Sequence, residues 1–364
     1  MTVRVVCLVV VVLGVVGACC AHGQPRSAKR TLERAVAAMN AKRYDEAEAI
    51  LRRLVKRYPN YTDARYELAL ALSLQNKLEE AFKYCTELCD TTLPRSMQRE
   101  QYFQLLGYLY SQQDDTARAF EAYRIGLERF PNSARLRVQR ALLLRQREQL
   151  DSARAEIERA IEADPTYPLS YYWGARFYRA SNEPIWAILY AEIYLNLRPN
   201  SSRADEMSAL WYNLFREAVE QFDEEKRIVL WQPSQHTISD SIQRRPFPEV
   251  YTAVLTECVR QLRFNRDFEL PLASLDTAIG CFIARWKALG YDTVYRNVLL
   301  ERYDQLAREG LLSAYIHVLG QFGKPMQYAE YAKNHRQLLA RLERWVLHHR
   351  LTMTPHSRVC RACW

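Results

Sequence analysis

The side chains best suited to metal binding or redox chemistry lie at the end of the chain. His348, His349, His356, Cys360 and Cys363 fall close together, and the two cysteines form a Cys-x-x-Cys pair. Imidazole and thiolate groups bind soft or borderline metals, and a Cys-x-x-Cys pair can cycle between dithiol and disulfide. This segment follows the last helical stretch and lacks the folded surroundings that such motifs require. We therefore predict an unstructured tail over residues 351–364, with a local disulfide and a metal site as alternatives.

No other part of the sequence shows a catalytic constellation. An enzyme should combine a nucleophile with a base, paired acids in a pocket, or a cluster of metal ligands. His236 lies in an irregular stretch, whereas His317 and His335 are isolated on helical segments, and we interpret each as structural. The sequence contains neither a glycine-rich phosphate loop nor a metalloprotease helix. We predict that the protein is not an enzyme and needs no cofactor; an envelope enzyme or a metal or redox carrier, using the tail or a pocket in residues 249–350, is the alternative.

The first 23 residues have the features of an export signal. Arg4 supplies a positive charge and an apolar run of 12 residues follows it, too short for the roughly 20 residues that span a bilayer. Val16-Gly17-Ala18-Cys19 resembles a bacterial lipobox, which implies cleavage before Cys19 and lipidation of that cysteine. The alternatives are cleavage before Gln24, which gives a soluble periplasmic protein, and a retained anchor.

This signal also limits the location and the partners. Nothing acidic follows Cys19, so the signal that resembles surface export is missing, and we predict a periplasm-facing lipoprotein, with the outer membrane favoured. The formal net charge of +9 falls by only one without the signal, because Arg4 is its sole charged residue. We expect no nucleic-acid partner, because an export signal separates the protein from the compartment that holds nucleic acid. Acidic proteins, acidic lipid headgroups or lipopolysaccharide phosphates suit a basic protein better, although the 51 basic residues interleave with 42 acidic ones.

A helix-pair motif recurs five times over residues 28–201 and leaves its small residues and prolines in register. Low glycine content (11 residues) and 49% apolar residues already favour an all-α fold. Small residues permit two helices to approach closely, and each proline ends a helical run. The three columns are Ala35, Ala69, Gly107, Ala141 and Ala175; Ala47, Ala81, Ala119, Ala153 and Ala187; and Pro59, Pro94, Pro131, Pro165 and Pro199.

These columns resemble the tetratricopeptide repeat (TPR), and Tyr44-Asp45-Glu46-Ala47 fits its pattern well. The resemblance implies an α-solenoid of about five stacked helix pairs, because a single pair cannot bury its own apolar stripe. The second unit is four residues longer than the others near Leu93-Pro94-Arg95-Ser96.

The region after the repeats is also helical. We predict a capping helix over residues 202–222, a connector over 223–248 and a C-terminal helical domain over 249–350, with helices at 249–265, 272–290, 294–309, 311–321 and 325–349. Gly290, Gly310, Gly320 and Gly323 stand where helix ends would need a positive φ. This half loosely resembles exported repeat proteins of Bacteroidota, which have no assigned activity to carry over.

The TPR resemblance implies that the first helix of each pair lines a concave groove, which would hold a peptide or protein partner. From the first repeats to the last, its side chains change from aromatic and polar to cationic. Tyrosine offers rigid contact area and arginine pairs with carboxylates, so an acidic segment is the partner that this surface suits, the alternative being solvated arginines. The predicted groove residues are Tyr66, Gln104, Tyr108, Arg135, Arg145, Tyr172, Arg176 and Arg179, together with Leu70, Ser73, Ser111 and Val138.

Cysteine usage adds little at this level. Three of the nine cysteines lie in the signal and the other six are scattered, so no disulfide framework is evident. Cys85 and Cys89 would share one helix face, where we expect two small buried residues, metal or redox use being the alternative.

Overall fold

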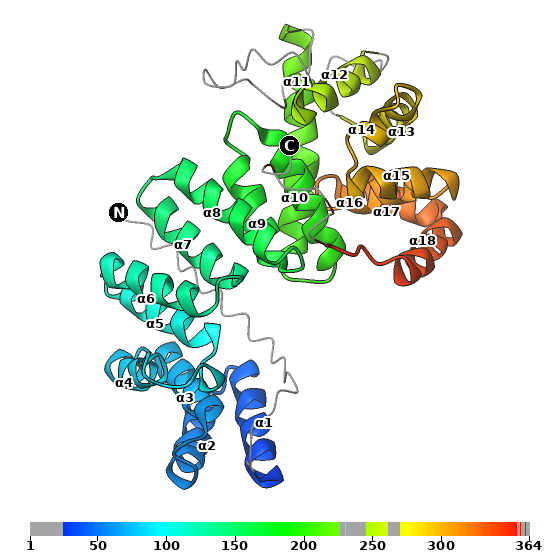
Figure 1. The fold of residues 1–364 in the computed structure, drawn as a ribbon. Coiled ribbons are helices and arrows are strands. Elements are labelled where there is room, and N and C mark those ends of the chain that lie inside the picture. The colour runs from blue at the N-terminus through cyan, green and yellow to red at the C-terminus, as the bar shows by residue number, and fades with distance from the viewer. Residues whose placement is uncertain are drawn as a thin grey trace. The chain divides into compact units, whose positions relative to one another are not determined.

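The computed structural model describes residues 25–225, 230, 245–260, 270–354, 357 and 361, in which α-helices, one 3₁₀ helix and turns make up the fold (Figure 1). The all-α prediction is confirmed, since no strand occurs among these residues. Cys19, His356, Cys360 and Cys363 lie outside them, as does most of the predicted connector. The chain forms two compact units, residues 1–131 and 132–364, each treated below by itself.

Five helix pairs account for the repeats. In the first unit α1 (Arg26–Asn40) packs on α2 (Tyr44–Arg57), α3 (Thr62–Leu74) on α4 (Leu78–Leu88), and α5 (Glu100–Gln112) on α6 (Thr116–Arg129). In the second unit α7 (Ala134–Gln146) packs on α8 (Leu150–Ala163), α9 (Pro168–Tyr178) on α10 (Pro184–Leu197), and α11 (Ala204–Glu225) follows against α10.

The small-residue columns are buried where the helices of a pair meet. All ten positions are inaccessible, Gly107 included. A Cβ atom added at Gly107 would lie 2.2 Å from Cε1 of Tyr123 on α6. Glycine at this position therefore makes room for a buried tyrosine ring on the partner helix, which is the close approach that the pattern predicts.

A further repeating feature is the turn inside each of the first four pairs. Lys42, Asn76, Asp114 and Glu148 have φ between 58° and 61°, and they follow the spacing of the alanine columns. The next residue in each turn donates its N–H to a carbonyl five residues earlier, as Lys77 does to Leu72 at 2.9 Å. This bond satisfies a carbonyl at the end of the first helix and fixes the turn that brings the second helix back.

The longer second repeat keeps both of its helices, α3 and α4, and its additional residues follow α4. α4 ends at Leu88, six residues before Pro94, and the short 3₁₀ helix η1 (Arg95–Met97) follows that proline. Gln98 is buried and donates Nε2 to the carbonyl of Asp90 at 2.7 Å, which closes the loop. Cys85 and Cys89 of this repeat are buried, as expected, and both are free thiols.

Seven helices follow in the second unit. They are α12 (Phe247–Val259), α13 (Leu272–Ala288), α14 (Tyr291–Val294), α15 (Val298–Arg308), α16 (Leu312–Leu319), α17 (Pro325–Asn334) and α18 (Arg336–His348). The prediction of one helix over 325–349 was wrong. At His335, φ is −123° and ψ is 33°, which ends α17 without a glycine or proline to signal the break.

The glycines of this region have two different roles. Gly290 and Gly310 adopt positive φ, as predicted, but Gly320 and Gly323 do not. A Cβ at Gly323 would lie 2.4 Å from Cβ of Tyr212, and one at Gly320 would lie 2.5 Å from Cδ2 of Leu272. The last two glycines therefore permit close packing around α11 and α16 rather than an unusual backbone.

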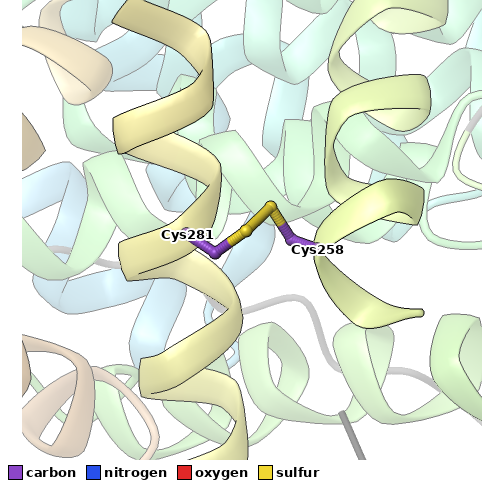
Figure 2. The surroundings of a disulfide bond; sticks show 2 residues. All are labelled: Cys258 and Cys281. Carbon is purple, nitrogen blue, oxygen red and sulfur yellow. A yellow bond between two sulfur atoms is a disulfide. The ribbon is translucent and has the colours of Figure 1, made fainter. Parts of the chain in front are cut away.

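A disulfide that the sequence did not reveal joins α12 to α13. Figure 2 shows Cys258 and Cys281 facing each other across these helices, with a Cα–Cα distance of 5.7 Å. The expectation of no disulfide framework is corrected by this bond. It closes a loop over a sequence separation of 23 and so restricts the unfolded chain.

The close approach of the helices predicts a sharp sensitivity to side-chain volume. Ala153→Trp should destabilise the second unit by roughly 1–3 kcal/mol or more, because Ala153 is only 1% exposed and a ring would overpack the crossing. Ala155→Trp, at an exposed position of the same helix, is the matched control and should leave the melting temperature nearly unchanged. Equal melting temperatures for both variants would contradict the packing described above.

Candidate functional site

The first helices of successive pairs contact one another and form a surface in each unit. α3 contacts α1 and α5 in the first unit, and α7 contacts α9 in the second. We call these the first and second inner faces. The helices of the first face carry Tyr66, Gln104 and Tyr108. Those of the second carry Arg135, Arg145, Tyr172 and Arg176, and Arg179 directly follows α9.

The first inner face combines tyrosine rings with carboxyl groups. Tyr66 is half-buried, and its ring centroid lies 5.4 Å from that of Tyr102, whose hydroxyl is 3.3 Å from Oδ1 of Asp63. Burial, together with Asp63, raises the pKa of Glu67 to about 7. The sequence prediction named the tyrosines but missed these two acids, which share α3 with Tyr66.

The second inner face is partly occupied by carboxylates of α11. Arg176 donates Nη1 to the Tyr172 hydroxyl at 2.9 Å and to Oε1 of Glu206 at 2.5 Å. The same Tyr172 hydroxyl donates to Oε2 of Glu206 at 2.7 Å. Arg179 lies 3.7 Å from Oε1 of Glu217. The two arginines that we expected to bind a partner therefore already have acidic neighbours within the chain.

The remaining cations of this face rest on aromatic rings. The guanidinium of Arg135 lies 5.5 Å from the ring centroid of Tyr167, and that of Arg145 lies 5.5 Å from that of Phe177. Arg145 is exposed, so it presents its charge to solvent while its position is supported by the ring. Leu70, Val138 and Tyr172, also predicted for these surfaces, are buried instead, and Tyr172 reaches Arg176 and Glu206 through its hydroxyl.

Three of the four histidines that the structure describes stack on aromatic rings. Tyr331 stacks between His317 and His335, with ring centroids 3.6 and 4.0 Å away. His349 stacks on Trp345 at 4.5 Å, and the neighbouring His348 is exposed. Within the described ranges no group of three or more His, Cys, Asp or Glu residues is arranged to hold a metal ion. Those residues also contain no helix long and apolar enough to cross a membrane.

A cavity of about 350 Å³ lies among α13, α14 and α15, in the region named for the alternative enzyme prediction. Three of its charged side chains pair with one another: Lys287 donates to Asp304 at 2.7 Å, and Arg308 also donates to Asp304. Although burial opposes it, hydrogen bonds from these two cations lower the pKa of Asp304. The cavity wall thus holds an ionised acid in an ion-pair network and does not join a nucleophile to a base.

A buried carboxyl group connects the last helix pair to the C-terminal helices. Glu192 of α10 is fully buried and accepts hydrogen bonds from Tyr303 Oη at 2.5 Å, Tyr315 Oη at 3.0 Å and Trp211 Nε1 at 3.3 Å. Asn196 donates to the same Tyr315 hydroxyl at 2.6 Å. These partners come from α11, α15 and α16, so one side chain joins four helices of the second unit.

Burial raises the pKa of Glu192 to about 7, and the hydrogen bonds only partly offset it. Because the folded pKa exceeds the unfolded value, the unfolded chain ionises first, and stability falls as pH rises from about 4.5 to 7. Across that pH range Glu192 should lower the free energy of unfolding by about 3 kcal/mol. Between pH 5 and pH 8 in urea unfolding, Glu192→Gln should reduce the loss of stability by the share of Glu192 and leave the share of Glu67, whose pKa is also raised to about 7. Glu162→Gln, at an exposed position on α8, should keep the whole loss. The same pH dependence in all three proteins would contradict the assigned pKa.

A protein-family comparison agrees with the helix pairs. A tetratricopeptide repeat model matches residues 32–93 and 105–168. No curated protein matches the chain. Similar solved structures include TTC0263, a thermophilic TPR protein of Thermus thermophilus (20% identity, TM-score 0.41, 48% of this chain and 93% of that one). A second is YrrB, a TPR protein with an unusual peptide-binding site (16% identity, TM-score 0.32, 48% of this chain and 87% of that one). A third is pilF of Pseudomonas aeruginosa (18% identity, TM-score 0.32, 52% of this chain and 97% of that one).

TPR arrays typically mediate protein–protein interaction and are generally not catalytic, because their stacked helices present an extended surface. The helix pairs, their small-residue columns and the match to the repeat family all indicate the TPR fold for the matched residues. Residues 32–93 and 105–168 are tetratricopeptide repeats, and they belong to an all-α fold in which further helices follow the helix pairs.

Proposed function

We propose that the protein is a non-enzymatic scaffold of the bacterial cell envelope that binds a protein or peptide partner through its inner faces, the C-terminal helices, or both. The observation that carries the proposal is the set of first helices in each unit, which bear half-buried tyrosines in the first unit and exposed or half-buried arginines in the second. Rigid aromatic rings and guanidinium groups supply much of the binding energy at protein interfaces. Tyr108 and Arg145 are examples of such side chains.

Two features support an envelope location. The first is the apolar segment after Arg4 with Cys19 at its end. The second is the Cys258–Cys281 disulfide, because disulfides form and persist in oxidising compartments such as the periplasm. We propose a lipid anchor at Cys19 that holds the protein at the periplasmic side of the outer membrane. A soluble periplasmic protein that begins at Gln24 is the other processing outcome.

The partner chemistry follows from the second inner face. Arg176 and Arg179 already lie beside Glu206 and Glu217. An acidic partner would compete with those carboxylates there, so Arg145 is the arginine that it would bind first. The exposed Arg145 guanidinium can pair with a carboxylate without displacing one of the chain's own. Such an exposed charge pair should be weakened by salt and should contribute mainly to the rate of association.

The binding prediction can be tested by crosslinking in envelopes and recovery of the protein with its partners. Arg145→Glu should lower partner recovery at low salt without changing the melting temperature. Arg198→Glu reverses the same charge at an exposed position after α10 and should recover partners as the wild type does. Arg176→Glu is a poorer probe, because it would place a carboxylate beside Glu206 and lower stability. Equal recovery by wild type and Arg145→Glu would exclude Arg145 from the binding surface.

The anchoring prediction concerns Cys19. Cys19→Ala should move the protein from the membrane fraction to the soluble fraction with its melting temperature unchanged, because the acyl chains contribute about 0.8 kcal/mol for each buried methylene. Mass spectrometry of the mature N-terminus is the direct measurement. A mature protein that begins at Gln24 would reject lipidation and favour the soluble periplasmic form.

A further inference from the structure

Arg361, near the end of the chain, is held by two acidic residues of the last two helix pairs. Its main-chain N–H donates to Oε2 of Glu158 at 2.8 Å and lies 3.1 Å from the hydroxyl of Tyr190. Its guanidinium donates Nη2 to Oε1 of Glu183 at 3.0 Å and Nε to the other oxygen of that carboxylate. One arginine is therefore recognised through both its main chain and its side chain.

The acceptor groups are positioned by the repeats rather than by the tail. Glu158 of α8 is 6% exposed, and the hydroxyl of the fully buried Tyr190 on α10 lies 2.7 and 2.9 Å from its two oxygens. Tyr178 of α9 packs edge-on against Tyr190, with ring centroids 5.8 Å apart. Burying a carboxylate is costly unless hydrogen bonds and a positive charge compensate. The site is thus a built acceptor for a cation with an adjacent N–H donor.

The geometry favours arginine over lysine. The two oxygens of Glu183 accept from Nε and Nη2 of a single guanidinium, which is the forked arrangement that an ammonium group cannot reproduce. The simultaneous bond to Glu158 comes from the main-chain N–H of the same arginine, so the site requires a backbone amide as well as a guanidinium. The recognised element is therefore an arginine within a peptide, not a free cation.

We propose that Glu158, Glu183 and Tyr190 form a docking site for an arginine-containing segment of a protein partner, and that Arg361 of the chain itself is the resident occupant that this segment replaces. The inference rests on the proposed scaffold function and adds a second surface, distinct from the inner faces, with its own partner chemistry. Arg361 thereby limits access to the site in the free protein.

Replacement is feasible because the resident contact is partly exposed. Half of the Arg361 side chain is accessible, so solvent screens its ion pair with Glu183. Its advantage over a partner comes from tethering, which supplies an effective concentration in the millimolar range. Removing the arginine should therefore increase the affinity of a competing segment by about tenfold or more.

The test uses full-length protein and a fluorescent peptide with the sequence of residues 357–364, its cysteines replaced by serine, in an anisotropy titration. Arg361→Glu vacates the site, because the new carboxylate repels Glu158 and Glu183, and this variant should bind the peptide at least about tenfold more tightly than wild type does. A peptide with lysine at the position of Arg361 should bind more weakly, since the fork is lost.

Adding Glu183→Gln to the Arg361→Glu protein should abolish peptide binding, with unfolding curves confirming that both proteins are folded. Failure of the Arg361→Glu protein to bind, or equal binding by wild type, Arg361→Glu and the double variant, would overturn the proposed site. The result is separable from the inner-face proposal. Loss of peptide binding leaves the effect of Arg145→Glu on partner recovery unchanged, and peptide binding can persist where that effect is missing.

Discussion

Close approach of the two helices in each pair is the constraint on which the structure depends. Where the helices cross, only alanine or glycine fits, and at Gly107 the space is taken by the ring of Tyr123 from the partner helix. Within each compact unit, neighbouring pairs bury their apolar stripes against one another, so stability is shared between them. The exposed side chains of the first helices are not needed for this packing. They are therefore the part of the repeat on which a binding function can be built.

Within the second unit, polar contacts determine which surfaces stay available. Glu192 joins the last helix pair to α11, α15 and α16, so the C-terminal helices are integrated with the repeats of that unit. Glu206 of the adjoining α11 reaches Arg176 and Tyr172 and occupies part of the second inner face. Glu158 and Glu183 instead receive Arg361. The same carboxylates that complete the fold thus leave Arg145 as the cation most open to a partner.

The sequence alone predicts the periodic features and misses the contacts between distant residues. The alanine columns, the helix pairs and the positive φ of Gly290 and Gly310 follow from local pattern and backbone sterics, which a single sequence displays. The Cys258–Cys281 bond and the pairing of Arg176 with Glu206 depend on how helices separated by 23 or 30 residues pack, which no local pattern encodes. The break at His335 was missed because no glycine or proline accompanies it.

Site-specific photocrosslinking in envelopes tests the central claim, that the first helices form the partner-binding surface, most directly. A photoreactive phenylalanine analogue would replace Tyr108 on α5, with the same substitution at the exposed Glu121 on α6 as the matched control. We expect a discrete crosslinked species from position 108 and none from position 121. Adducts from position 121 alone, or equal adducts from both, would contradict the assignment of the inner faces as the binding surface.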